Sequence, residues 1–375
     1  MTSKLWLLLA IPILLKLLKR RPLPPREAQL PFEQERVLLL GASSGVGRDL
    51  ALVYAKRGSR ICLVARRQTE LEKVREECVA LGLDAEKVIM FAGDVSNTSD
   101  LISIRDVIYN AWEGLDTLHI LAGLPSTLTL LGQAGVDLSP VPSSRASYTG
   151  IKRRDFHVGG ATFPDVPGGI PTKEGLDVVA ADARKLSEVN YVGTLLALTC
   201  FLPLLSATSK SPVVHHLSSV AAGITPPHRV VYGSTKGAAL IAMEAARVEC
   251  EGCGVRFFSL LPGTINNDFR LKLSTSGQPG RDETKMSSIK SGLESLLLSP
   301  ETVVKTIFTN LSLNPAPQPL IPYPPFSWFR SLDVPPNSTQ YIPSLYTWAK
   351  LMTFTPLGYL YVEPRARVKY GLPKW

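Results

Sequence analysis

The chain has little cysteine, no acidic residue in its first 26 positions, and no unbroken apolar run of membrane-spanning length. Its five cysteines are an odd, scattered set, which excludes a disulfide framework and favours a reducing compartment. Cys250 and Cys253 form a lone CxxC without a second pair or a nearby histidine, so we expect packing thiols and no metal site. Hydrophobic residues make up 45% of the 375 positions, which excludes a disordered chain.

Positive charge is concentrated at the two ends of the chain. Residues 1–26 hold six basic side chains and no acid, and residues 363–375 hold four basic side chains and one acid. Because the formal net charge is +9, the residues between these ends are neutral overall. A nucleic-acid-binding protein would carry its basic excess on the folded domain, whereas basic ends beside apolar segments suit an anionic membrane surface. We therefore expect a membrane as partner and no nucleic acid.

The N-terminal segment contains the apolar run Leu5–Leu15, extended by Leu17 and Leu18. This stretch is shorter than the roughly twenty residues that cross a bilayer as a straight helix. The following KLLKRRPLPP offers no signal-peptide cleavage site, and a soluble core helix there would have nothing to pack against. We expect residues 1–21 to form a single membrane anchor, spanning or monotopic, and residues 22–34 to form a linker. The basic residues that follow the run place the rest of the chain in the cytosol.

Residues 313–375 are rich in proline and aromatic side chains, with 12 of the 30 prolines and 12 of the 28 aromatics. The stretch Ser344–Tyr361 carries a single charge. Trp and Tyr at this density resemble the belt found at lipid headgroups. An extension packed over the mouth of a substrate site is the alternative, and both interpretations place an apolar surface near that site.

From residue 35 to residue 312, short apolar runs alternate with amphipathic stretches, which predicts βαβ units and a parallel sheet. The expected strands are Arg36–Leu40, Arg60–Ala65, Val88–Phe91, Thr117–Leu121, Val213–Leu217 and Val255–Leu261. The expected helices are Val46–Arg57, Thr69–Leu81, Leu101–Trp112, Asp177–Leu205, Tyr232–Glu251 and one capped by Ser299. Residues 124–176 lack periodicity and are expected to be an insertion or a long surface loop. The fold class is α/β, a Rossmann-like doubly wound parallel sheet in a single domain.

A glycine-rich turn, GASSGVG, stands between the first expected strand and the first helix. Glycine permits a tight turn there, and a pyrophosphate can approach the free N–H groups at the helix N-terminus. The pattern predicts a dinucleotide site at Gly41, Ser43, Ser44, Gly45, Val46 and Gly47.

The end of the second strand lacks the acid that binds the ribose 2′-hydroxyl of NAD. Arg66 and Arg67 stand there instead, and guanidinium groups can hold the 2′-phosphate of NADP through charge-assisted hydrogen bonds. Two solvated arginines at a helix start are the plainer alternative. We expect NADP(H), with Asp94 and Val95 beside the adenine.

Tyr232 and Lys236 are four residues apart on an expected helix, so their side chains share one face. The pKa of a free tyrosine, about 10, is too high for proton exchange near neutrality, and a nearby ammonium lowers it. Ser219 follows a strand and can donate a hydrogen bond to a substrate carbonyl. A surface tyrosine with a solvated lysine is the alternative, which Ser219 and the glycine turn together make unfavourable.

With these residues, the chain from about Arg36 to about Asn310 resembles the short-chain dehydrogenase/reductase family, in its membrane-anchored NADP(H)-dependent form. The matching pieces are GASSGVG, Asp94-Val95, Asn190 in VNYVG, Ser219, YGSTK and Pro262-Gly263-Thr264. The resemblance implies that Tyr232 is the general acid/base, Lys236 lowers its pKa and binds the nicotinamide ribose, Ser219 polarises the carbonyl, and Asn190 holds a water. It also implies cofactor contacts from Ala122, Gly123, Tyr232, Lys236, Pro262, Gly263 and Thr264.

The chain departs from the family pattern in three places. Leu40 replaces the threonine that usually opens the glycine motif, and Ile120-Leu121-Ala122-Gly123 replaces Asn-Asn-Ala-Gly. The segment from Gly123 to Asn190 is also longer than is usual in the family. None of these changes removes a catalytic group.

The resemblance implies an oxidoreductase that acts on CH–OH and C=O groups by reversible hydride transfer. The apolar ends favour a hydrophobic substrate (a keto-lipid, a sterol-like molecule or a secondary-metabolite intermediate) and the endoplasmic reticulum as location. The alternative is a family member that binds NADP(H) as a sensor or scaffold, against which the four intact catalytic residues argue. A homodimer is expected only by analogy with the family.

Overall fold

The computed structural model describes the central domain and parts of the C-terminal segment. The described residues are 25–126, 128–141, 155–159, 171–224, 227–267, 269, 297–312, 318–319, 333–334, 339–342, 345–352 and 362. The anchor expected at residues 1–21 lies outside them. In the Ser344–Tyr361 stretch, only residues 345–352 are described.

A seven-stranded sheet in the order β11-β8-β7-β4-β1-β2-β3 forms the centre of the molecule. Its strands are β1 (Arg36–Leu40), β2 (Arg60–Ala65), β3 (Val88–Ala92), β4 (Thr117–Ile120), β7 (Val213–Leu217), β8 (Arg256–Pro262) and β11 (Thr339–Ile342). Every pairing within it is parallel. Because helices cover both faces, strands such as β1 read as unbroken apolar runs. The doubly wound α/β fold is confirmed.

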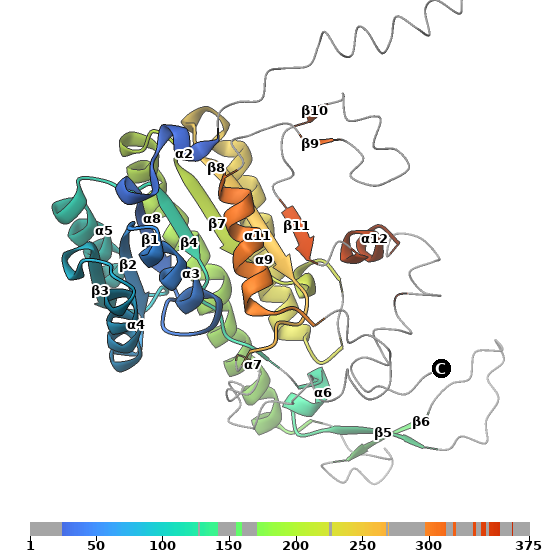
Figure 1. Ribbon diagram of the computed structural model, residues 1–375. Coiled ribbons are helices and arrows are strands. Elements are labelled where there is room, and N and C mark those ends of the chain that lie inside the picture. Colours follow the sequence, from blue (N-terminus) through green and yellow to red (C-terminus); the bar gives the residue numbers. More distant parts are fainter. Residues whose placement is uncertain are drawn as a thin grey trace, which may run out of the picture.

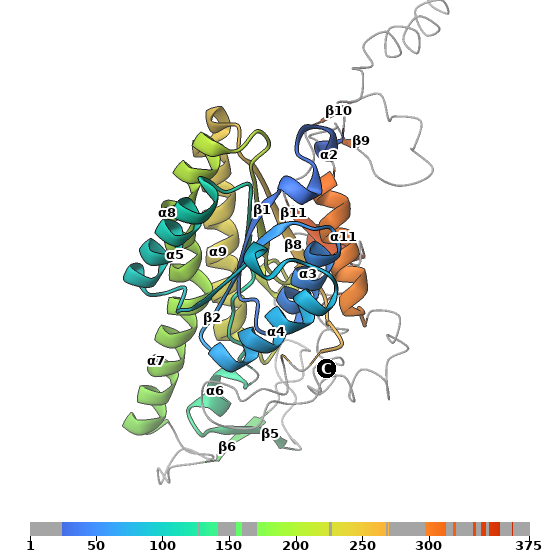
Figure 2. The same ribbon diagram turned by 60° about the vertical axis from the view of Figure 1, so that its left-hand side comes forward.

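Helices pack on both faces of the sheet, as Figures 1 and 2 show. One layer consists of α3 (Gly45–Lys56), α4 (Gln68–Ala80) and α11 (Pro300–Ser312), and the other of α5 (Thr98–Trp112), α8 (Gly193–Thr208) and α9 (Val230–Glu249). Each layer forms its own apolar core with one face of the sheet. The remaining short elements are α2 (Arg26–Gln29), η1 (Phe32–Gln34), η2 (Ala85–Lys87), η5 (Glu251–Cys253), β9 (Gln318–Pro319) and β10 (Asp333–Val334).

The expected helix Asp177–Leu205 is longer and carries a π-helical turn, η3 (Glu188–Val192), between α7 (Lys173–Ser187) and α8. Within the described residues, Lys173–Thr208 is the one helix whose length and composition would allow it to cross a membrane. Since α8 packs against the sheet and α5, its apolar composition also serves the core. A π-turn inside an α-helix often marks a functional position.

The insertion at residues 124–176 contains short helical and strand elements that the hydrophobic pattern of the sequence does not predict. They are α6 (Leu130–Gln133) and an antiparallel pair, β5 (Asp137–Val141) with β6 (Asp155–Gly159).

The Pro- and aromatic-rich segment 313–375 contributes directly to the sheet. β11 pairs with β8, with Thr339 opposite Ser259 and Ile342 opposite Pro262, and α12 (Leu345–Met352) follows. The segment after the expected boundary at residue 312 therefore supplies one strand of the sheet that lies before this boundary. A four-residue strand between prolines is too short to show a period of two.

Arg26 does not contribute to a solvated basic segment, although the sequence groups it with the N-terminal charges. Its side chain is buried, forms an ion pair with Glu35 and donates to Thr117 Oγ1 over 2.8 Å. The charge is needed there because Glu35 is itself buried beside the start of β1.

All five cysteine thiols are free. Burial raises the pKa of the Cys62 thiol, and it raises the pKa of Cys78 to about 11. Both cysteines lie in the apolar cores, where a neutral thiol packs as a small hydrophobic group.

Candidate active site

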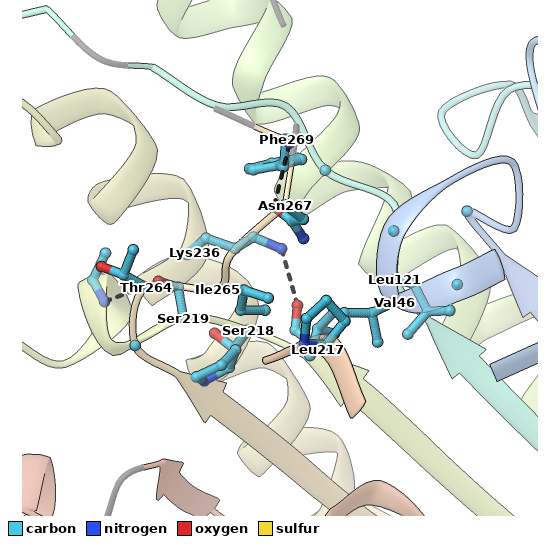
Figure 3. Close-up of a pocket in the computed structure, with 18 of the residues that line it drawn as sticks. Val46, Leu121, Leu217, Ser218, Ser219, Lys236, Thr264, Ile265, Asn267 and Phe269 are labelled. Carbon is cyan, nitrogen blue, oxygen red and sulfur yellow. Dashed lines mark hydrogen bonds between the residues drawn. The ribbon is translucent and has the colours of Figure 1, made fainter. Parts of the chain in front are cut away.

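A cavity of about 430 Å³ lies at the carboxyl ends of the central strands. The strand order reverses between β1 and β4, and such a switch point leaves a crevice in an open parallel sheet. Its lining includes these expected site residues: Gly41, Ser44, Gly45, Val46, Gly47, Gly123, Ser219, Tyr232, Lys236, Pro262, Gly263 and Thr264. Figure 3 shows part of this lining, contributed by β7, α9, the turn after β1 and the loop after β8.

The glycine turn is packed so closely that no side chain fits at two of its positions. A Cβ at Gly41 would lie 2.7 Å from the Ala122 nitrogen, and one at Gly47 would lie 2.1 Å from the Gly41 oxygen. Gly41 also has φ +108°, which side chains rarely tolerate. The N-terminus of α3 therefore opens onto the cavity as bare backbone, an arrangement that fits the pyrophosphate of a dinucleotide.

The arginine pair lies beside this turn but outside the cavity lining. The Arg67 guanidinium donates to Ser43 Oγ over 2.9 Å and to Ser44 Oγ over 3.3 Å. Arg66 lies 3.8 Å from an Asp94 carboxylate oxygen, and its side chain is about half exposed. The structure thus brings Arg67 to the glycine turn, while Arg66 lies beside Asp94.

Val95, the neighbour of Asp94, is buried rather than lining the cavity. A Cβ at Gly193 would lie 2.8 Å from Val95 Cγ2, so α8 begins in direct contact with this residue. Val95 therefore packs the segment after β3 against the start of α8.

Ser219, Tyr232 and Lys236 all line this cavity. Ser219 precedes η4 (Val220–Ala222) directly after β7, and its Oγ accepts a hydrogen bond from the Ala221 N–H over 3.2 Å. Lys236 is buried, and its Nζ donates to the Leu217 carbonyl over 3.1 Å (Figure 3). Burial lowers the pKa of Lys236 to about 8.

Asn190 is fully buried in the π-turn and is held by three hydrogen bonds. Its Oδ1 accepts from the Leu124 N–H over 2.7 Å, and its Nδ2 donates to the Leu124 carbonyl over 3.1 Å and to Thr235 Oγ1 over 3.0 Å. A Cβ at Gly123 would lie 3.2 Å from Lys236 Nζ and 3.3 Å from Asn190 Oδ1. These polar groups converge at Gly123, which explains why the ILAG sequence keeps its glycine.

These observations agree with a match to a family model. The model described as short chain dehydrogenase matches residues 35–135 and 166–276. The chain belongs to the short-chain dehydrogenase family. The unmatched residues between the two ranges contain most of the β5–β6 insertion.

The relatives of this short-chain dehydrogenase include steroid-named plant proteins. It is 29% identical over 232 residues to 11-beta-hydroxysteroid dehydrogenase-like 2 of Arabidopsis thaliana, covering 62% of this chain and 59% of that protein. A shorter match, 40% identical over 93 residues, is to an 11-beta-hydroxysteroid dehydrogenase of Pinus massoniana, covering 25% of this chain and 26% of that protein. The longer match therefore spans about three fifths of the length of the curated relative.

Solved structures share the fold of this short-chain dehydrogenase. One is an alcohol dehydrogenase from Thermococcus sibiricus complexed with 5-hydroxy-NADP (TM-score 0.52, 19% identity, 83% of this chain and 97% of that one). Another is a short-chain dehydrogenase/reductase of unknown function from Caenorhabditis elegans, solved with cofactor (TM-score 0.55, 19% identity, 75% of this chain and 90% of that one).

Some cavity residues of this short-chain dehydrogenase lie outside the sequence motifs. The Oγ of Ser218, which no motif includes, and the Oγ1 of Thr264, which the Pro262-Gly263-Thr264 motif includes, are buried and have no hydrogen-bond partner among the described residues, so they suit a polar ligand. Asn267, in the loop after β8, reaches to 3.5 Å from the Cβ position of Gly45. Arg229 and Phe269 also line the cavity. Two of them stand beside a motif that could have pointed to them, since Ser218 is next to Ser219 and Arg229 lies three residues before Tyr232.

Proposed function

We propose that this protein is an NADP(H)-dependent oxidoreductase that interconverts a ketone or aldehyde and an alcohol on a hydrophobic substrate. The observation that carries the proposal is that Ser219, Tyr232 and Lys236 share one cavity with the bare-backbone glycine turn. The names of the plant relatives support a carbonyl or hydroxyl group on an apolar skeleton.

When held by the glycine turn and the Pro262-Gly263-Thr264 loop, a nicotinamide coenzyme would supply the hydride for reduction of the carbonyl carbon and would accept it in oxidation. In reduction, the Tyr232 hydroxyl gives its proton to the carbonyl oxygen, and Ser219 Oγ donates a hydrogen bond to the same oxygen. Below pH 8 most of Lys236 is cationic, which favours the Tyr232 phenolate left after the transfer. We assign to Asn190, whose Oδ1 lies with Lys236 Nζ at Gly123, the binding of a water for the return of the proton, as the family resemblance implies.

The preference for NADP(H) is supported by the arginine pair. A 2′-phosphate beside Ser43 and Ser44 would lie within reach of Arg67, whose Nη2 donates to both of these hydroxyls. Arg66 contributes a second, mostly solvated cation. Both are positioned by the end of β2 and the start of α4.

Activity is tested with the full chain in detergent, by following NADPH oxidation at 340 nm. We expect turnover of bulky hydrophobic ketones, such as an 11-ketosteroid or phenanthrenequinone, to exceed that of acetone. NADPH binding without turnover of any ketone in the set would contradict the proposal and favour a sensor or scaffold.

We also propose that residues 1–21 anchor the protein in a membrane, with the catalytic domain facing the cytosol, on the endoplasmic reticulum. The support is the apolar run and the basic residues that follow it. Deleting residues 1–21 is expected to move most of the protein from the membrane pellet to the supernatant in a fractionation experiment. An unchanged pellet fraction would instead assign the attachment to the aromatic C-terminal segment.

A further inference from the structure

Arg229 is a buried cation at the catalytic end of the cavity. It immediately precedes α9, one helical turn before Tyr232, and its side chain lines the cavity while only 5% of the residue is exposed. Its Nη1 donates to the Ser126 carbonyl over 2.7 Å, and its guanidinium carbon lies 5.8 Å from the centre of the Tyr232 ring. The residue before it, His228, has φ +60°, an unfavourable conformation for a non-glycine residue.

We infer that Arg229 is a second positive charge that stabilises the ionised form of Tyr232. The inference rests on the proposed role of Tyr232 as proton donor. A cation within about 6 Å of an aromatic ring is attracted to its electron density, and that density rises when the phenol becomes a phenolate. Arg229 therefore acts through Tyr232 and needs no contact with the substrate.

Tyr232 packs within an apolar cluster, and charged groups lie on the elements around it. The apolar side chains of the cluster are Leu186, Val231, Leu124, Ala183, Ala221 and Phe269. On α7, the buried acid is Asp182, next to Ala183. On β7, burial first and the nearby Lys236 second hold the pKa of His216 well below its ordinary value, so this histidine is neutral.

Arg229 and Lys236 differ in how they respond to pH. Lys236 loses its charge as the pH rises through about 8, because its buried ammonium is poorly solvated. A guanidinium keeps its charge throughout the range in which proteins are stable. Above pH 8, Arg229 is thus the cation of this pair that continues to favour the phenolate.

The experiment measures the ionisation of Tyr232 directly, by NMR of the full chain labelled with ¹³Cζ-tyrosine. The chain has 11 tyrosines, and the resonance absent from Tyr232→Phe identifies Tyr232. In Arg229→Gln, which keeps an N–H donor for the Ser126 carbonyl, we expect the midpoint of the Tyr232 titration to rise by about one pH unit. Arg229→Lys keeps the charge and is expected to restore at least half of this shift.

The matched control is Arg247→Gln, which removes a half-exposed arginine on the same helix and should leave the midpoint unchanged. A midpoint in Arg229→Gln equal to that of the parent would overturn the inference, and so would equal shifts in Arg229→Gln and Arg229→Lys. If Arg229→Gln does not fold, Arg229→Met is titrated against Arg229→Lys under the same criteria. Because the midpoint is read without substrate or cofactor, a failure of the proposed activity leaves this result interpretable.

Discussion

Replacing Tyr232 with phenylalanine is expected to lower kcat for ketone reduction about 10³-fold, since general acid catalysis contributes about 10²- to 10⁴-fold. The substitution removes only the hydroxyl that delivers the proton. The ring stays packed against Leu186 and Val231, so NADPH affinity should change less than about threefold. Steady-state kinetics and NADPH fluorescence titration measure the two quantities separately.

The control for this variant is Tyr109→Phe on α5, where the residue is 54% exposed and far from the cavity lining. It should retain the full activity of the parent. Parental activity in Tyr232→Phe would show that another group delivers the proton and that the proposed mechanism is wrong.

The double variant Arg66→Ala, Arg67→Ala is expected to weaken NADPH binding about 100-fold and NADH binding less than about threefold. Each hydrogen bond between a guanidinium and a phosphate contributes about 1.5 to 3 kcal/mol, and NADH has no 2′-phosphate to lose such bonds. Isothermal titration with both coenzymes measures the ratio. Arg67→Ala alone should account for most of the loss, because Arg67 is the arginine that reaches the glycine turn.

Arg105→Ala provides the control for general charge removal. Arg105 lies on α5, on the other face of the sheet, and pairs with Asp106 at the surface. Its removal should weaken both coenzymes equally and only slightly. Equal losses of NADPH and NADH affinity in the Arg66/Arg67 variant would eliminate the assignment of the 2′-phosphate site.

The six strands from β1 to β8 that belong to the main sheet were predicted to within one residue at each end. Parallel strands covered on both faces are mostly apolar, so their pattern is strong and local. The helix starts were less accurate. For example, α5 begins at Thr98 because the Asn97 side chain accepts hydrogen bonds from the Ser99 and Asp100 N–H groups. The apolar period begins only at Leu101, which placed the predicted start too late.

Part of the candidate site could be predicted from the sequence because two of its components are formed by residues close together in the chain. The glycine turn and the Tyr232–Lys236 pair each fit within one turn and one helix, where spacing determines geometry. Asn267 and Arg229 reach the cavity from positions outside the motifs. The approach of Asn267 to the glycine turn joins distant segments, so no spacing along the chain reveals it. Arg229 is three residues from Tyr232, and its position beside the ring depends on the conformation of its side chain.

The amino-acid sequence alone determined the alternation of strands and helices, the glycine turn and the pairing of a phenol with an amine on one helical face, because each depends on neighbours a few residues apart. Only the tertiary structure decided that β11 completes the sheet, that Asn190 meets Lys236 at Gly123 and that Arg229 lies beside Tyr232. The first two contacts join segments tens of residues apart, and they form only when the burial of the two apolar cores brings the strand ends together. Arg229 is only three residues from Tyr232, and the fold decides its position by burying its side chain at the cavity.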